Sequence, residues 1–155
     1  MLRKMLINTR LASVTLPASL QSLGKDAFAC CDALKTVNFA EGIALEEIRE
    51  DAFAMCVHLP AITLPDSVKT VGKYAFVNCL ELKEVNLGNG VEELKEQAFL
   101  YDSALVKLTV PASLSVIGEK VLEGHGPDLE VICPEGSAME KYLQENAPDV
   151  KITRP

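Results

Sequence analysis

The sequence lacks tryptophan, has few aromatic residues of any kind (5% of 155) and contains no cluster of Lys or Arg. Acidic residues outnumber basic ones, 22 to 15, so the formal net charge is −7. Because binding to phosphate groups requires clustered positive charge, nucleic acids and anionic membrane surfaces are disfavoured as partners. No apolar run approaches the roughly 20 residues that span a bilayer, so we expect no insertion into a membrane.

Motifs of catalysis and cofactor binding are also lacking. The sequence has no glycine-rich dinucleotide or phosphate loop, no Gly-x-Ser-x-Gly and no His-Glu-x-x-His. Its five cysteines are an odd number and no two are spaced as Cys-x-x-Cys, which argues against a disulfide framework and against a zinc site. We therefore expect no cofactor, no metal and no enzymatic activity.

A secretory signal peptide is not evident either. The segment MLRKMLINTR at residues 1–10 lacks the apolar core of about 7–15 residues that such a peptide needs. Unpaired cysteines likewise favour a reducing compartment. These residues alone indicate either a cytoplasmic protein or a piece of a longer one.

What the sequence does contain is an internal repeat. Five units share the pattern L-x-x-V-x-L-P-x-S-L-x-x-I-G-x-x-A-F-x-x-C, and they begin at Leu11, Leu34, Leu59, Leu82 and Leu105. Four units have 23 residues, and the second has two more, inserted around Ala44 and Leu45. One unit cannot bury its own apolar face but stacked units can, so we predict a solenoid over residues 11–136 with a parallel sheet.

Each unit carries the same local signals. Alternation of apolar and polar residues, as in Val14-Thr15-Leu16, predicts a strand, and a proline that cannot donate to a ladder ends it in three units. Glycine at 24, 72 and 118 is expected to supply turn backbone. Phe76 and Cys79 are three residues apart, a spacing that suits one helical or 3-10 turn.

Equivalent residues of stacked units should form columns in the core. Phenylalanines at 28, 53, 76 and 99 form one column, with Leu122 closing it. Cys31, Cys56 and Cys79 form another, continued by Asp102 and His125. Small apolar thiols suit a crowded interior, and we expect Cys133 to be buried and Cys30 to lie at the surface. The alternative is that Cys56 and His58 form a catalytic thiol pair.

The two ends differ from the repeat. Residues 1–10 align with the second half of a unit, with Met5 in the phenylalanine column and Asn8 in the cysteine column, so they form a partial repeat. Its uncovered stack end predicts weak self-association through residues 1–20. Residues 137–155 form a cap: Ser137 and Glu140 are a capping box for a helix to about 146, and a short strand follows at 150–152.

At this level of detail the repeat resembles a known family. VTLPASLQSLGKDAFACC (14–31) and ITLPDSVKTVGKYAFVNC (62–79) resemble the BspA-type leucine-rich repeats of bacterial surface proteins and some protist proteins. The resemblance implies an α/β solenoid: a right-handed superhelix with its parallel sheet on the concave side and short turns opposite. It also implies binding or adhesion rather than catalysis, at the cell surface or in secretion.

Binding would use the outward side chains of the concave strands, because concave solenoid faces are extended binding platforms. The candidate site residues are Thr15, Thr36, Asn38, Thr63, Glu84, Asn86, Lys107 and Thr109. We expect one continuous polar column down this face and a protein ligand. Two alternatives remain: these residues merely keep an exposed sheet soluble, or the repeats are a structural spacer within a larger protein.

Overall fold

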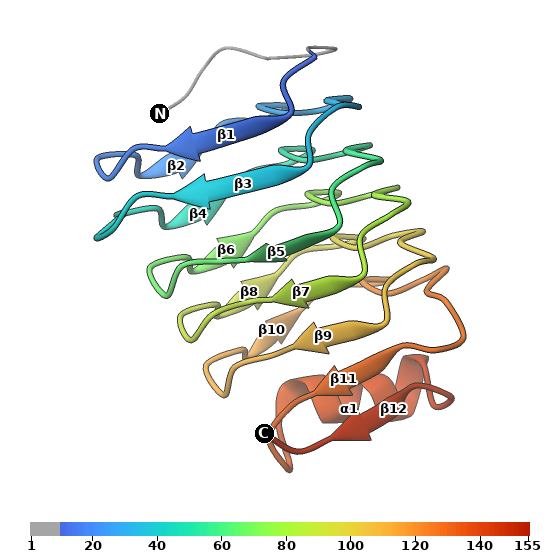
Figure 1. The fold of residues 1–155 in the computed structure, drawn as a ribbon. Coiled ribbons are helices and arrows are strands. Elements are labelled where there is room, and N and C mark those ends of the chain that lie inside the picture. Colours follow the sequence, from blue (N-terminus) through green and yellow to red (C-terminus); the bar gives the residue numbers. More distant parts are fainter. Residues whose placement is uncertain (1–9) are drawn as a thin grey trace.

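The computed structural model describes residues 10–155, which wind into a parallel β-solenoid of about six turns with one helix near the C-terminus (Figure 1). One side of the stack, the long-strand side, carries β1 (Ser13–Leu16), β3 (Thr36–Phe39), β5 (Ala61–Thr63), β7 (Glu84–Asn86), β9 (Lys107–Thr109), β11 (Glu130–Ile132) and β12 (Lys151–Thr153). All pairings between these strands are parallel. The solenoid predicted from the repeat is confirmed.

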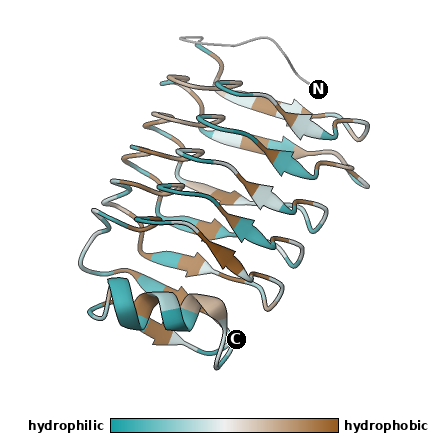
Figure 2. Ribbon diagram, turned by 180° about the vertical axis from the view of Figure 1, so that it is seen from behind, coloured by the Kyte–Doolittle hydropathy of each residue, from teal (hydrophilic) through white to brown (hydrophobic). Residues whose placement is uncertain are grey.

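A second sheet runs along the stack behind the long strands, and the sequence analysis missed it. Its five members have only two residues each: β2 (Ser22–Leu23), β4 (Glu47–Ile48), β6 (Thr70–Val71), β8 (Glu93–Leu94) and β10 (Val116–Ile117). Two residues are too few to show an alternating pattern, so the sequence predicts no strand in this segment of the repeat. Figure 2 shows hydrophobic and hydrophilic residues alternating along the strands of the stack.

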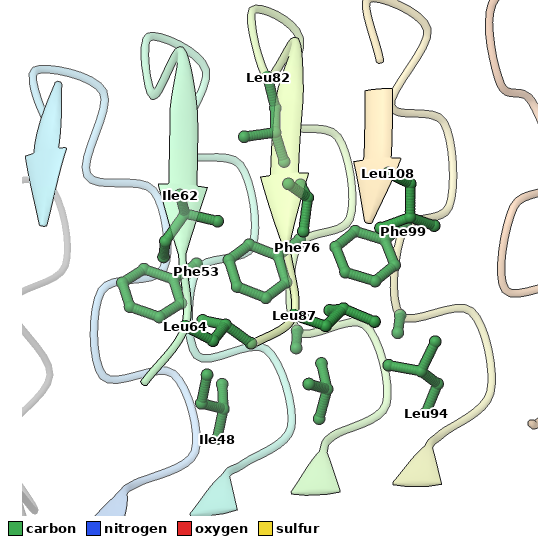
Figure 3. Packing of buried hydrophobic residues seen from close by; sticks show 14 of the residues in the cluster. Ile48, Phe53, Ile62, Leu64, Phe76, Leu82, Leu87, Leu94, Phe99 and Leu108 are labelled. Atoms are coloured by element: carbon green, nitrogen blue, oxygen red, sulfur yellow. The ribbon is translucent and has the colours of Figure 1, made fainter. Parts of the chain in front are cut away.

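The core is built from columns of like residues, as predicted. Rings of Phe28, Phe53, Phe76 and Phe99 stack in succession, with centroids 5.3, 5.2 and 5.2 Å apart and nearly parallel planes. Figure 3 shows the last three of these rings. All four side chains are buried, and Leu122 closes the column. Aromatic pairs at this spacing stabilise the core beyond the area that they bury. The phenylalanine column therefore ties consecutive turns together.

The Ala-Phe segment differs from the predicted helical or 3-10 turn. It is a series of hydrogen-bonded turns in which alternate N–H groups donate to the next unit, for example Phe28 to Ala52 and Cys30 to Ala54, both at 2.8 Å. Two residues per unit then adopt positive φ, near 57° at Asp26 and Cys30. In a helix these N–H groups would donate to carbonyls of the same helix, whereas here they donate to carbonyls of the next unit and so join neighbouring turns of the stack.

Glycine in the repeat has a different role from the one expected. Gly72 and Gly118 do not have positive φ. A Cβ at Gly72 would instead lie 2.6 Å from the carbonyl carbon of Arg49, and one at Gly118 would lie 2.3 Å from the backbone nitrogen of Glu96. These positions thus need glycine because the backbones of successive turns come very close.

The long-strand side is interrupted once. β3 pairs with β1 and β5 pairs with β7, but in the described chain β3 and β5 form no ladder, and Figure 1 shows the wider space between them. At equivalent positions Lys35 donates its N–H to Ala12, and Lys83 donates to Pro60, both at 2.9 Å. Pro60 itself has no N–H, so the corresponding bond to Lys35 cannot form. The second sheet continues past this point, since β4 pairs with β6.

The C-terminal cap agrees closely with its prediction. Helix α1 (Ala138–Asn146) follows the N-cap Ser137, whose side chain accepts from the Glu140 N–H at 3.3 Å, while the Glu140 carboxylate accepts from the Gly136 N–H. Met139 and Leu143 are buried against the last turn. β12 then pairs with β11, one residue later than predicted.

Met5, Asn8 and most of the predicted partial repeat lie outside the described residues. Self-association through residues 1–20 therefore stays a prediction.

Removing one ring from the middle of the phenylalanine column tests its role in stability. We expect Phe76→Ala to lower the free energy of unfolding by roughly 3–5 kcal/mol, because it leaves a cavity between Phe53 and Phe99. Urea denaturation followed by circular dichroism measures the loss. An unchanged midpoint would contradict the core position of Phe76.

Restoring the missing donor tests the cause of the interruption. In Pro60→Lys the new N–H can bond the Lys35 carbonyl, so we expect slower amide hydrogen exchange at Ala61 and Thr63. The gain of about 1 kcal/mol for the bond is partly offset by loss of proline's rigidity. The converse variant Lys83→Pro should open the β5–β7 ladder. Unchanged exchange in Pro60→Lys would show that the proline is not the cause.

Candidate functional site

The predicted binding residues all lie on the outward side of the long strands, which form two hydrogen-bonded ladders. Cα positions pair Thr63 with Asn86 and Asn86 with Thr109, in a neutral polar row. Thr15 pairs with Asn38 in the same way. Between Asn38 and Thr63 the interruption at Pro60 intervenes. The ladder that aligns Thr63, Asn86 and Thr109 therefore does not include β1 and β3, although β3 and β5 remain in contact. A single binding column that includes Thr15, Thr36 and Asn38 stays a prediction.

The other five predicted residues come together in one place. Thr63, Glu84, Asn86, Lys107 and Thr109 line a shallow hollow of about 160 Å³ over β5, β7 and β9. Its floor is formed by Ala61, Ile62 and Val85. Ile62 and Val85 are buried, so the floor is held by the core while the rim side chains face solvent. We call these five residues and the space between them the central hollow.

A second hollow adjoins the first at the C-terminal ends of the same strands. It has a volume of about 360 Å³ and shares Thr63, Asn86 and Thr109 with the central hollow. The residues that it adds include Asp66, Asn89, Pro111, Pro134 and Pro155. Proline-containing loops at the strand ends therefore enlarge the outward surface and add apolar lining to it. We call this second space the loop hollow.

Some polar groups of the loop hollow are already hydrogen-bonded within the chain. The Asp66 carboxylate accepts from the Asn89 N–H at 2.8 Å, and this bond lowers the pKa of Asp66. A Cβ at Gly90 would lie 1.8 Å from the Asp66 carbonyl oxygen. The Gly-Asn-Gly at 88–90 is accordingly a turn of the fourth unit that packs against the third unit.

A charged row extends the site beyond the predicted residues. Glu84, Lys107, Glu130 and Lys151 are in register on four successive strands, with alternating sign. Lys151 Nζ lies 3.0 Å from Glu130 Oε1, and the Thr153 hydroxyl also donates to that carboxylate. The hydrogen bonds from Thr153 and Lys151 lower the pKa of Glu130.

Sequence reasoning missed Glu130, Lys151 and Thr153 because they lie past the last full unit. A signal was present: aligning Cys133 with Leu16 places Glu130 in the outward slot of Ser13. β12 has no counterpart in the repeat, so Lys151 and Thr153 could only be placed from the structure.

The catalytic thiol pair considered from the sequence is not assembled. Cys56 is fully buried, donates its S–H to the Phe28 carbonyl at 3.2 Å, and has its pKa raised to about 12 by burial. His58 lies at the surface, with Nδ1 2.9 Å from Glu81 Oε1. A nucleophile needs an accessible thiolate, which Cys56 does not provide. Cys133 is buried and Cys30 is partly exposed, as predicted.

Residues 10–155 contain no group of three or more His, Cys, Asp or Glu side chains placed to hold a metal ion. Nor does this part of the chain have a helix with the length and apolar character needed to cross a bilayer.

Comparison with known proteins identifies the repeat. A model of the BspA type leucine rich repeat region matches residues 3–126 in six copies. A search of curated proteins gave no match.

Solved structures of other proteins share the fold. A leucine rich cell surface protein from Faecalibacterium prausnitzii is 24% identical with a TM-score of 0.59, and the match covers 78% of this chain and 38% of that one. A leucine-rich repeat protein from Bacteroides capillosus is 24% identical with a TM-score of 0.53, over 80% and 75% of the two chains. The T. pallidum leucine rich repeat protein is 22% identical with a TM-score of 0.51, over 81% and 60%.

Thiol reactivity provides a test of the buried cysteine column. We expect a maleimide reagent to modify Cys30 in the native protein and to leave Cys56 and Cys79 unmodified, because burial and raised pKa values suppress their thiolates. Mass spectrometry of tryptic peptides locates the label, and labelling in denaturant provides the full count. Rapid native labelling of Cys56 or Cys79 would contradict the packing that we describe.

Proposed function

Because the chain belongs to the BspA-type leucine-rich repeat family, we propose that it is a non-catalytic module that binds another protein through the central and loop hollows. Leucine-rich repeat proteins generally bind proteins. Their stacked strands present side chains on an extended face, which can contact a partner over several turns.

One observation carries this proposal. In the described chain the side chains of Thr63, Glu84, Lys107 and Thr109 make no hydrogen bond or ion pair, although they surround one hollow. The neighbouring polar groups Asp66 and Glu130, in contrast, are bonded within the chain. Polar side chains that the fold does not use are available to a ligand, so the central hollow is our proposed contact point.

The chemistry of the hollow indicates the kind of contact. Its rim offers hydroxyl and amide groups, one carboxylate and one ammonium, and it has no aromatic or arginine side chain of the kind that anchors tight interfaces. We therefore propose a polar partner surface held by hydrogen bonds and paired charges. Such contacts favour specificity over very high affinity.

The cell surface is the proposed location. The relative from Faecalibacterium prausnitzii is described as a cell surface protein, and this chain spans 38% of it. We accordingly propose that these turns act as the binding portion of a surface or secreted protein. The alternative is a structural spacer, in which the same turns only separate other parts of a larger protein.

A substitution where the central and loop hollows meet distinguishes a binding module from a structural spacer. The wild-type chain is immobilised, and proteins captured from cell-surface extracts and culture supernatants are identified. Their affinity is then measured by surface plasmon resonance. Asn86→Arg places a long cation where both hollows meet, and we expect it to weaken binding at least tenfold by obstructing the site.

Matched controls are available elsewhere on the stack. Thr70→Arg changes the second sheet, and Asn38→Arg changes the equivalent position beyond the interruption at Pro60. Both should retain binding. Equal affinity of Asn86→Arg and wild type would contradict the proposed site, and the absence of any specific capture by wild type would favour the spacer.

A further inference from the structure

The buried cysteine column has a repeating hydrogen-bond pattern. The thiol of Cys56 donates to the carbonyl of Phe28, and the thiol of Cys79 donates to the carbonyl of Phe53, both at 3.2 Å. Each sulfur is also bonded by the backbone of the preceding cysteine in the column, Cys31 for Cys56 and Cys56 for Cys79. A side chain in this column therefore acts both as a donor and as an acceptor toward the turn before it.

Asp102 occupies the next position of the same column. It is 1% exposed and is the one charged or strongly polar residue in the buried set of the described chain. Oδ1 accepts from the Cys79 N–H at 2.8 Å, which reproduces the acceptor role of the thiols. Oδ2 is buried and has no hydrogen-bond partner as an acceptor. The donor role of the thiol has no equivalent in an ionised carboxylate.

The repeat identifies the group that this donor would bond. The carbonyl of Phe76 stands to Asp102 as the carbonyl of Phe53 stands to Cys79, 26 residues earlier in each case. It accepts the Cys79 N–H at 3.3 Å, just as Phe53 accepts the Cys56 N–H at 3.2 Å. Its second lone pair is thus in the position that receives a thiol proton in the turns before it.

We propose that Asp102 is held as a neutral carboxylic acid whose Oδ2–H donates to the carbonyl oxygen of Phe76, which makes the fourth turn a pH-sensitive point of the stack. A protonated carboxyl has the donor and the acceptor that this column requires, whereas a carboxylate has acceptors only. Ionisation places a negative charge beside a carbonyl oxygen in the core, without a compensating cation.

The surrounding groups support the neutral form. Burial raises the pKa of Asp102 from 3.8 to about 8, and the Cys79 N–H opposes this only in part. Two titratable groups flank it in the column: the Cys79 thiol, whose own pKa is raised by burial and by Asp102, and the His125 ring. His125 Nδ1 is engaged with the Gly126 carbonyl at 2.9 Å. No ion pair to Asp102 forms in residues 10–155.

The direction of the pH effect follows from proton linkage. The folded chain holds this proton more tightly than the unfolded chain, so the stabilising contribution is complete below about pH 4. It declines as the pH rises and is lost above about pH 8. Within that window, each pH unit raises the unfolding constant about tenfold through this one group. The stability is lost in the turn between Phe99 and Leu105, which contains Asp102.

Asp102→Asn provides the test, because an amide supplies N–H donors and a carbonyl acceptor and does not ionise. Urea unfolding of the full chain is measured for wild type and Asp102→Asn from pH 5 to 9. We expect the wild-type unfolding constant, divided by that of the variant, to rise about tenfold per pH unit to pH 7 and to level off above about pH 8. Dividing by the variant removes the contribution of His125 and other shared groups.

Two further measurements keep the outcome decisive. Asp102→Cys restores the cysteine of the repeat. Below pH 8 its unfolding constant should depend on pH in the same way as that of Asp102→Asn. Carbon-13 NMR of the wild-type carboxyl reports its titration directly, even if the variants do not fold. A carboxyl that titrates below pH 5, or parallel pH profiles for wild type and Asp102→Asn, would overturn the proposal.

Discussion

Backbone hydrogen bonding between consecutive turns is the constraint on which the rest of this structure depends. It decides conformation even against local preference: Met55 and Tyr101 adopt φ of 56° and 61°, a left-handed region that costs such residues about 1 kcal/mol each. Their N–H groups donate to Val77 and Glu123 on the next turn. A buried N–H without a partner costs as much or more, so the stack accepts this strain at every unit.

The same constraint explains what the sequence could and could not predict. Side chains that meet like side chains, such as Phe53 and Phe76, repeat with the period of the turns, so the core columns were predictable. The residue type of Met55 does not indicate its positive φ, and two-residue strands such as β6 are too short to show an alternation of apolar and polar residues. Pro60 was visible, but its effect depends on a bond that only the register of the strands shows.

The candidate site, like the fold, was predictable only in part. The repeat shows which positions point outward, and all eight predicted residues do so. It does not show which of them share a surface, because outward side chains have no part in the stacking and are under no periodic rule. The grouping of Thr63, Asn86 and Thr109 depends on the interruption before β5 and on proline loops at the strand ends. The interruption occurs once along the described stack, so the period of the repeat does not reveal it.

Departures from the repeat are therefore where this chain acquires properties of its own. Pro60 removes a donor between two turns, Gly90 admits a carbonyl where three other units have serine, and Asp102 replaces a thiol by an acid. Each change alters one bond between turns while the phenylalanine column holds the turns at a nearly constant 5.2–5.3 Å. The phenylalanine column limits how far each of these changes spreads. A single turn can therefore lose a backbone bond, pack more closely or contain a titrating group while its neighbours keep the geometry of the repeat.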